Sequence, residues 1–140
     1  MKGRYFLDTN IFIYSFDLSN SAKQQKANQL IKAALVENKG CISYQVIQEF
    51  INVATRKFVA PLSILDCHRY VDSVLYPLCQ IFTSIDLYHQ ALDLMQRWQY
   101  SFYDALILAA ALQADCTVLY SEDLRHNQSI KSLTILNPFL

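Results

Sequence analysis

The chain has 140 residues, 53% of them hydrophobic and 17% charged, which suits one domain with a buried core and is too short for two. Its 12 Lys and Arg balance 12 Asp and Glu, which excludes the strongly basic surface of a general nucleic-acid binder. The sequence has no low-complexity run. We therefore expect one domain over residues 1–140 that folds throughout.

The first residues combine basic side chains with an apolar stretch, as secretory leaders do. Asp8 and Asn10 interrupt that stretch, however, and no small-residue cleavage site follows, so we expect a first strand rather than a signal peptide. No uncharged apolar run approaches the roughly 18 residues needed to span a bilayer. The expectation is a soluble cytoplasmic protein that has no membrane contact.

Taken in chain order, residues 4–7 are a short aromatic and aliphatic run that ends at Asp8. This pattern predicts a buried strand and a turn, with helix resuming near Ile11. Residues 21–38 carry apolar side chains at helical spacing and lysines on the other faces, which predicts an amphipathic helix. Gly40 is the expected stop of that helix.

The middle of the chain alternates between short strands and helices. Residues 41–43 predict a brief strand, after which Ser43 is placed to cap a helix that Pro61 closes. A second helix over residues 63–75 is expected to end before Pro77, and residues 78–82 give the next strand.

Two capping patterns follow. Thr83 and Asp86 are spaced to open a helix that runs towards Trp98, and Ser101 and Asp104 repeat the spacing before the run ALILAAALQA. That run is apolar on all sides, so its helix is expected to be central.

The last strands are predicted over residues 117–120 and 133–136. Short strands that alternate with helices indicate an α/β fold: a short, mostly parallel central sheet flanked by helices. In such sheets ligands bind beyond the carboxyl ends of the strands.

Four acids are candidates for a site there. Asp8 and Asp123 each follow a predicted strand, whereas Glu49 and Asp104 lie beside apolar helix faces, with no Lys or Arg at helical spacing to neutralise them. Like charges ~4 Å apart repel by about 4 kcal/mol at an effective dielectric near 20. Gathered carboxylates therefore call for a cation, and oxygen ligands favour Mg²⁺ or Mn²⁺. Such a centre suits hydrolysis of a phosphodiester.

Each acid also has a plain structural explanation when it is taken alone. Asp8 could cap the next helix, and Asp104 could be the partner of a Ser101 cap. Glu49 could extend past the edge of its helix, and Asp123 could be a solvated loop acid. These separate explanations do not account for two acids on apolar helix faces together with two at strand ends.

Five segments of the sequence, in this order, resemble the PIN-domain family and, within it, the VapC-type toxins of bacterial toxin-antitoxin pairs: FLDTNIFIY, SYQVIQEF, SFYDALILAAAL, VLYSEDL and NPF. Together they span nearly the whole chain. The resemblance implies that Asp8, Glu49, Asp104 and Asp123 bind the metal and carry catalysis. It also implies supporting roles for Asn10 and Ser121, and Glu122 could assist or replace Asp123.

The resemblance further implies an endoribonuclease that cuts single-stranded RNA with Mg²⁺ or Mn²⁺, forms a homodimer, and is bound by an antitoxin that inserts a segment near the active site. One departure from the family is the run His126-Asn127-Gln128, where relatives commonly have Gly in the middle. Because Asn tolerates a left-handed backbone, we expect the turn to survive.

Alternative functions remain open at this stage. A haloacid-dehalogenase-like phosphatase also has an aspartate after its first strand, but it needs a second acid where this chain has Asn10. A non-catalytic module of the same fold that binds RNA or protein is the other alternative. It could use Lys23, Lys26, Arg56, Lys57 and Arg125 for phosphates, and Tyr44, Tyr100, Phe102 and Tyr103 for bases.

Two further site types are disfavoured. Nucleotide-binding loops need several glycines, and the chain has only Gly3 and Gly40. Its four cysteines lie far apart and are expected to be small buried side chains rather than zinc ligands: Cys41, Cys67, Cys79 and Cys116.

Overall fold

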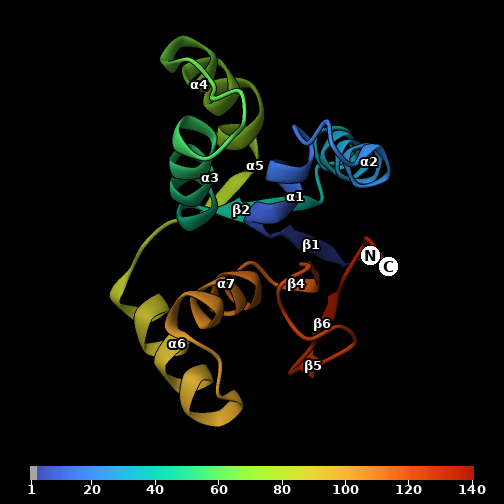
Figure 1. Ribbon diagram of the computed structural model, residues 1–140. Coiled ribbons are helices and arrows are strands. Elements are labelled where there is room, and N and C mark those ends of the chain that lie inside the picture. The colour runs from blue at the N-terminus through green and yellow to red at the C-terminus, as the bar shows by residue number, and fades with distance from the viewer. Residues whose placement is uncertain (1–2) are drawn as a thin grey trace.

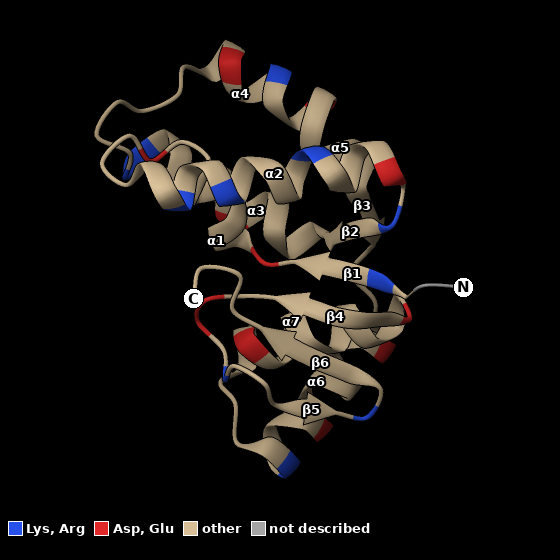
Figure 2. Ribbon diagram, turned by 90° about the vertical axis from the view of Figure 1, so that its right-hand side faces the viewer, with Lys and Arg blue, Asp and Glu red and all other residues tan. Residues whose placement is uncertain are grey.

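The computed structural model of the protein describes residues 3–140. Its strands form one sheet in the order β3-β2-β1-β4-β6-β5 (Figure 2). The strands are β1 (Arg4–Leu7), β2 (Gly40–Ser43), β3 (Cys79–Ile81), β4 (Cys116–Tyr120), β5 (Ser129–Ile130) and β6 (Leu133–Leu136). All the described neighbours are parallel except β5, which runs antiparallel to β6. The predicted α/β fold with a mostly parallel sheet is confirmed.

Helices cover both faces of this sheet. They are α1 (Thr9–Tyr14), α2 (Ser21–Glu37), α3 (Tyr44–Arg56), α4 (Ile64–Tyr70), α5 (Tyr76–Leu78), α6 (Ile85–Trp98) and α7 (Phe102–Gln113), with a π-helical turn η1 (Val71–Leu75) between α4 and α5. In Figure 1, α1, α2, α3 and α5 lie above β1 and β2, and α6 and α7 lie below them. No helix within residues 3–140 is long and apolar enough to cross a bilayer.

The pairing of β1 with β4 positions the functional site. The two strands are parallel neighbours, with Leu7 in register with Tyr120, and the backbone N–H of Asp8 donates to the Tyr120 carbonyl at 3.0 Å. Because parallel neighbours end at the same edge of a sheet, the residues after β1 and after β4 emerge side by side. Two of the predicted acids, Asp8 and Asp123, are brought together in this way.

The helix α7 is central, as its apolar sequence predicts. Every residue from Ala105 to Ala111 is buried, and the helix packs against α6, β4 and β2. The Ser101 hydroxyl caps its first turn by accepting the backbone N–H of Asp104. The carboxylate of Asp104 therefore lies in the capped first turn of a helix whose middle is buried.

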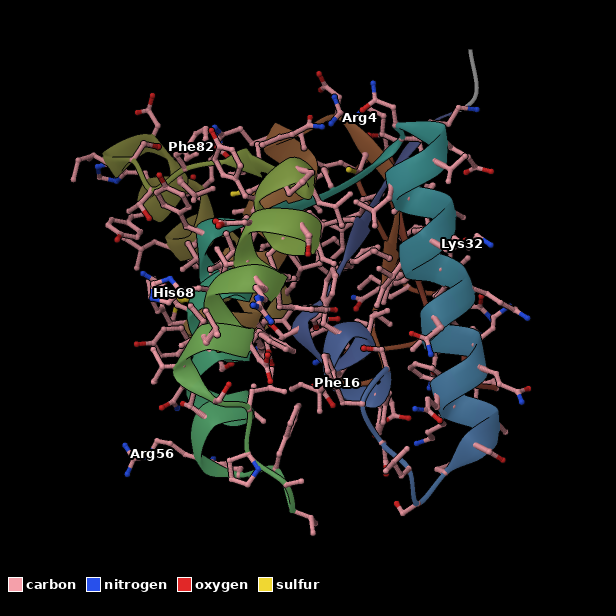
Figure 3. All side chains as sticks on the ribbon, turned by 90° about the horizontal axis from the view of Figure 1, so that it is seen from above. Arg4, Phe16, Lys32, Arg56, His68 and Phe82 are labelled. Atoms are coloured by element: carbon pink, nitrogen blue, oxygen red, sulfur yellow. The ribbon has the colours of Figure 1, made fainter. Side chains whose placement is uncertain are left out.

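An aromatic cluster joins the elements above the sheet. The ring of Phe16, just after α1, contacts Phe50 of α3, Tyr70 of α4 and Phe58, with ring centroids 5.1 to 5.8 Å apart. Figure 3 shows Phe16 between α2 and the α3 and α4 layer. These contacts hold α1, and hence the residues that follow Asp8, against α3.

The predicted stop of the second helix is wrong. The helix α2 ends at Glu37, its C-cap residue Asn38 adopts the left-handed backbone (φ 58°), and Gly40 already belongs to β2. Gly40 is required because a side chain at this position would clash with its neighbours. A Cβ atom built on Gly40 would lie 2.4 Å from the Cβ of Ala34 and 2.9 Å from the ring of Tyr5.

Other boundaries also shift. Helix begins at Thr9, not near Ile11, because Asp8 itself is the N-cap. The helix predicted to end before Pro77 continues past it through η1, since proline in a first turn forfeits no hydrogen bond. The cap of α6 is Ser84, one residue after the predicted Thr83. The two-residue strand β5 was too short to predict.

Candidate active site

All four predicted acids line one open pocket at the carboxyl ends of β1 and β4. Its volume is about 270 Å³. The residues that line it, called here the acid pocket, are Asp8, Thr9, Asn10, Ile13, Gln45, Glu49, Asn52, Val53, Asp104, Ile107 and Asp123. They come from the start of α1, from α3, from α7 and from the loop after β4. Carboxylates from four distant parts of the chain thus share one concavity.

Asp8 is the most buried of the four acids, with 7% of its surface exposed. One carboxylate oxygen accepts the backbone N–H of Thr9 at 2.7 Å, and the other accepts the Ser121 hydroxyl at 2.7 Å. The Asp8 pKa is raised to about 7, mainly by burial and to a smaller extent by the charges of Glu49 and Asp123, while the two hydrogen bonds oppose the rise. The ionised carboxylate lacks a compensating positive charge.

Glu49 faces the pocket from the middle of α3 and is held by neutral donors. The Thr9 hydroxyl donates to one of its oxygens at 2.5 Å, and the Gln45 amide donates to the other at 3.2 Å. The same amide also donates to the backbone carbonyl of Tyr103 at 3.0 Å, which ties α3 to the start of α7. Gln45 was not predicted as a site residue, although it lies four residues before Glu49 and hence on the same helix face.

Asp104 and Asp123 complete the acid pocket. Asp104 is half-buried in the first turn of α7, where the positive end of the helix dipole favours a negative charge. Asp123 is exposed, and the Asn10 amide donates to its carboxylate at 3.1 Å. The backbone N–H of Asp123 donates to the Ser121 hydroxyl at 3.2 Å. Asn10 and Ser121 therefore contact the acids through hydrogen bonds, and their supporting role in catalysis stays a prediction.

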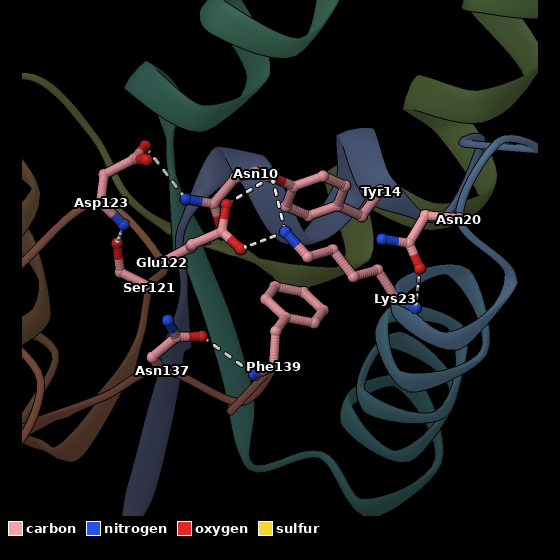
Figure 4. A network of polar contacts seen from close by, with 9 residues as sticks. All are labelled: Asn10, Tyr14, Asn20, Lys23, Ser121, Glu122, Asp123, Asn137 and Phe139. Carbon is pink, nitrogen blue, oxygen red and sulfur yellow. Dashed lines mark hydrogen bonds and ion pairs between the residues drawn. The ribbon is translucent and has the colours of Figure 1, made fainter.

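Glu122 has different surroundings from its neighbour Asp123. Its carboxylate is paired with the Lys23 ammonium at 2.6 Å and accepts the Tyr14 hydroxyl, and Lys23 also lies over the Tyr14 ring (Figure 4). The residue does not line the acid pocket. Glu122 thus anchors the loop to α1 and α2, and its placement does not support the expectation that it assists or replaces Asp123 directly.

The turn after this loop keeps its shape without glycine. Asn127 adopts the expected left-handed backbone (φ 67°), and its N–H donates to the Ile135 carbonyl at 2.8 Å. The turn is also held by His126, whose ring nitrogen accepts the backbone N–H of Asn137 at 2.9 Å. The departure from the family pattern leaves the local fold intact.

The acid pocket has no built-in cation. Within residues 3–140 the ion pairs are Lys23 with Glu122 and Arg69 with Asp66, and neither includes a pocket acid. Lys and Arg positions are spread over separate parts of the ribbon in Figure 2 rather than gathered on one face. The negative charge at the pocket is therefore not neutralised by basic side chains.

The chemistry of the donors fits a hard divalent cation. Carboxylate and amide oxygens are the ligands that Mg²⁺ and Mn²⁺ prefer. Two amide oxygens at the pocket, Oδ1 of Asn10 and Oε1 of Gln45, are buried without a hydrogen-bond partner among the described residues. In the same range no three His, Cys, Asp or Glu side chains are grouped tightly enough to hold an ion as they stand. Cation binding therefore requires the acids to converge from their present hydrogen bonds.

The remaining predicted groups lie elsewhere. Cys41, Cys67 and Cys116 are buried as predicted, with the sulfur atoms of Cys41 and Cys116 3.4 Å apart, whereas Cys79, which was also expected to be buried, is half-buried in the short strand β3. Of the aromatic candidates for base contacts, Tyr100 is buried and donates to Gln128. Tyr44 and Tyr103, by contrast, are exposed close to the acid pocket.

A family model matches most of the chain. The family model described as the PIN domain matches residues 5–129. No curated protein matches the sequence. Among solved structures, a toxin-antitoxin complex from Klebsiella pneumoniae has a TM-score of 0.68 at 21% identity, and the match covers 96% of this chain and 97% of that one.

Two further solved structures are similar in fold. Mycobacterium tuberculosis VapC20, described as a Sarcin-Ricin loop cleaving toxin, has a TM-score of 0.61 at 19% identity, covering 85% of this chain and 89% of that one. Rickettsia felis VapBC2, solved with a fragment of promoter DNA, has a TM-score of 0.64 at 20% identity, covering 94% and 96%. At these identities the likeness extends to the fold.

Proposed function

Since the chain belongs to the PIN-domain family, we propose that it is a metal-dependent endoribonuclease that hydrolyses single-stranded RNA. The observation that carries the proposal is the acid pocket. Four carboxylates from separate elements line one concavity, and no Lys or Arg among the described residues pairs with them. Their mutual repulsion and the burial of Asp8 favour occupation by a divalent cation.

Asp8, Glu49, Asp104 and Asp123 would hold Mg²⁺ or Mn²⁺. When bound, the cation would lower the pKa of a water molecule and stabilise negative charge on the phosphate. The side chains of this protein provide the orientation. Asp8 is fixed by Ser121 and by the Thr9 backbone, Glu49 by the Thr9 hydroxyl and Gln45, and Asp123 by Asn10.

The unpartnered oxygen of Asn10 adds a second role. It is an acceptor at the acid pocket with no partner among the described residues, so a water molecule that enters beside the acids could donate a hydrogen bond to it. The aliphatic side chains of Ile13, Val53 and Ile107 also line the pocket and offer no hydrogen bonds to further water molecules. Together these groups favour one attacking water at a phosphodiester.

We further infer that the chain is the toxin of a toxin-antitoxin pair. An apolar groove of about 620 Å³, whose lining includes Ile13, Phe16, Leu18, Phe58 and Val59, opens beside the acid pocket, and Ile13 lines both. Leu18 and Val59 are 88% and 107% exposed. An antitoxin segment with apolar side chains in this groove could place a basic side chain at the acids.

The nuclease proposal is tested with purified protein and a mixture of RNAs in Mg²⁺, Mn²⁺ or EDTA. Cleavage is expected with either metal and is absent in EDTA and in the Asp104→Asn variant. Asp93→Asn, which changes an exposed acid on α6 outside the acid pocket, is the matched control and should cleave normally. RNA binding without cleavage under every metal condition would favour the non-catalytic alternative.

The toxin proposal needs a separate test. The product of a small reading frame directly upstream would be co-expressed with the chain, and a complex that no longer cleaves RNA is expected. Leu18→Glu and Val59→Glu should weaken that complex while leaving cleavage by the free chain intact, because both side chains lie outside the acid pocket. Unchanged complex formation by the double variant would rule out the apolar groove as the docking site.

A further inference from the structure

We propose that a second pocket, adjoining the acid pocket, binds one unpaired base of the RNA by stacking on exposed aromatic side chains. The proposal rests on the proposed ribonuclease function and identifies a part of the substrate that the chain would recognise. The pocket, called here the aromatic pocket, is formed by the start of α3, the end of β3 with the link to α6, α6 itself and the start of α7. Its volume is about 220 Å³.

The two pockets share a wall. Gln45 lines both of them, and its amide donates to the Tyr103 carbonyl, next to Asp104 in the chain. A base held in the aromatic pocket would therefore keep its own backbone close to the acids. This adjacency makes the aromatic pocket part of the same substrate path rather than an unrelated surface.

Several aromatic rings of this pocket are open to solvent. Tyr44, Phe82 and Tyr103 are 43%, 49% and 65% exposed. Each is steadied by an edge-to-face neighbour: Tyr44 and Phe82 contact one another at 4.7 Å between ring centroids, and Tyr103 contacts Phe102 at 5.2 Å. An edge-to-face pair leaves one ring with both flat surfaces free of its partner, so a base can stack there.

Two buried polar atoms point to a ligand with a polar edge. Ser43 and Gln45 are lining residues of the aromatic pocket and are 3% and 8% exposed, and the Ser43 hydroxyl and Gln45 Oε1 are buried with no partner among the described residues. Ser43 stands at the N-cap of α3, yet its side chain makes no capping hydrogen bond, contrary to the sequence prediction. Unpartnered buried groups are costly. A base edge offers the donors and acceptors that would satisfy them.

The properties of the pocket favour a base over other occupants. No charged residue lines it, so a neutral ring is accommodated next to the acid pocket, where an anionic group would be repelled. Its volume is below the range of pockets for larger ligands and suits a single planar ring system. A second copy of the chain covering the same aromatics is the competing occupant, and the test separates the two.

Binding is measured on the cleavage-inactive Asp104→Asn chain by fluorescence anisotropy with short labelled oligoribonucleotides. Tyr44→Ala and Tyr103→Ala should each weaken binding about 5- to 100-fold, the range measured for loss of one stacked base. Tyr44→Phe and Tyr103→Phe should bind normally because the ring remains. Tyr76→Ala, an exposed tyrosine on α5 outside both pockets, is the matched control. Equal affinities across the set would overturn the proposal.

An abasic scan locates the base itself. The same oligoribonucleotide is prepared with a single abasic site moved along it, and one position should lose affinity. At that position Tyr103→Ala should cause no further loss, because ring and base act as one interacting pair. Ser43→Ala should alter the preference among the four bases there. Full additivity of the two losses would mean that Tyr103 does not contact a base.

Failure of the proposed function and failure of the aromatic pocket give different results. If the unmodified chain cleaves no RNA with Mg²⁺ or Mn²⁺, the proposed function fails. If it cleaves but the tyrosine variants keep their affinity and KM, only the aromatic pocket is refuted. Sedimentation velocity decides the competing occupant: a dimer that Tyr44→Ala or Tyr103→Ala dissociates would mean that the aromatics form a subunit interface, and would overturn base binding.

Discussion

Replacing Asp8 with asparagine measures the cost of holding an ionised carboxylate at the acid pocket without a cation. Asn keeps the size of the side chain and an oxygen that can accept the backbone N–H of Thr9. It removes the charge and changes the hydrogen bond from the Ser121 hydroxyl. The variant therefore separates electrostatic cost from packing.

The magnitude follows from the pKa of Asp8. Burial, the largest cause, and the nearby acids raise it from 3.8 to about 7, so between these values the folded chain holds a proton that the unfolded chain has lost. Stability of the metal-free chain must then fall as pH rises through this window. Ionising Asp8 in the folded chain therefore lowers the free energy of unfolding by roughly 4 kcal/mol, at 1.36 kcal/mol per pKa unit.

The assay is urea unfolding in EDTA at pH 5 and pH 8, on the wild type and the Asp8→Asn variant. The free energy of unfolding of the variant relative to the wild type should rise by about 3 kcal/mol from pH 5 to pH 8, leaving the variant more stable at pH 8. Other groups titrate alike in both chains, so their contributions cancel in the difference. Asp93→Asn, with an exposed side chain, should show no such change.

A variant that is less stable than the wild type at pH 8 by 1 kcal/mol or more would refute this reasoning. It would mean that the Ser121 and Thr9 donors more than offset the burial of the charge. The acid pocket would then be balanced without a cation, and the argument for a metal from electrostatic repulsion would fail.

Four other outcomes are expected. Mg²⁺ should raise the melting temperature of the wild type by mass action and raise that of Asp8→Asn less, and equal shifts in calorimetry would count against a metal site. Gly40→Ala should cost roughly 1–3 kcal/mol in urea unfolding, because its Cβ meets Ala34 and Tyr5, and a neutral effect would contradict the packing. Gln99→Gly should stabilise by up to about 1 kcal/mol, since Gln99 holds a left-handed backbone (φ 60°) that glycine adopts freely; destabilisation would refute this. Lys23→Met should lower the free energy of unfolding more at low salt than at molar salt, because salt screens the ion pair that Lys23 makes with Glu122; a salt-independent loss would point to packing instead.

Hydrophobic periodicity in the sequence was enough to predict the alternation of strands and helices, the parallel sheet and the central position of α7. These features depend on local sequence: short continuous apolar runs predicted the strands, apolar side chains at every third or fourth residue predicted the helices, and a run that is apolar on all sides predicted the central helix. The four acids could also be chosen from the sequence, because Asp8 and Asp123 follow strands and Glu49 and Asp104 interrupt apolar faces. The parallel pairing of β1 with β4 brings Asp8 and Asp123 together, and the packing of α3 and α7 adds the other two acids to their pocket.

Contacts between residues distant in sequence were decided by the tertiary structure alone. Adjacent in the chain, Glu122 and Asp123 look alike, yet one pairs with Lys23 from α2 and the other lines the acid pocket. Gly40 appeared to be a helix stop, whereas it provides room for a side chain from α2 and one from β1. Local spacing determines which face of a helix or strand is apolar. Which element packs against that face is decided only when the elements come together, and so is which buried polar atoms lack a hydrogen-bond partner.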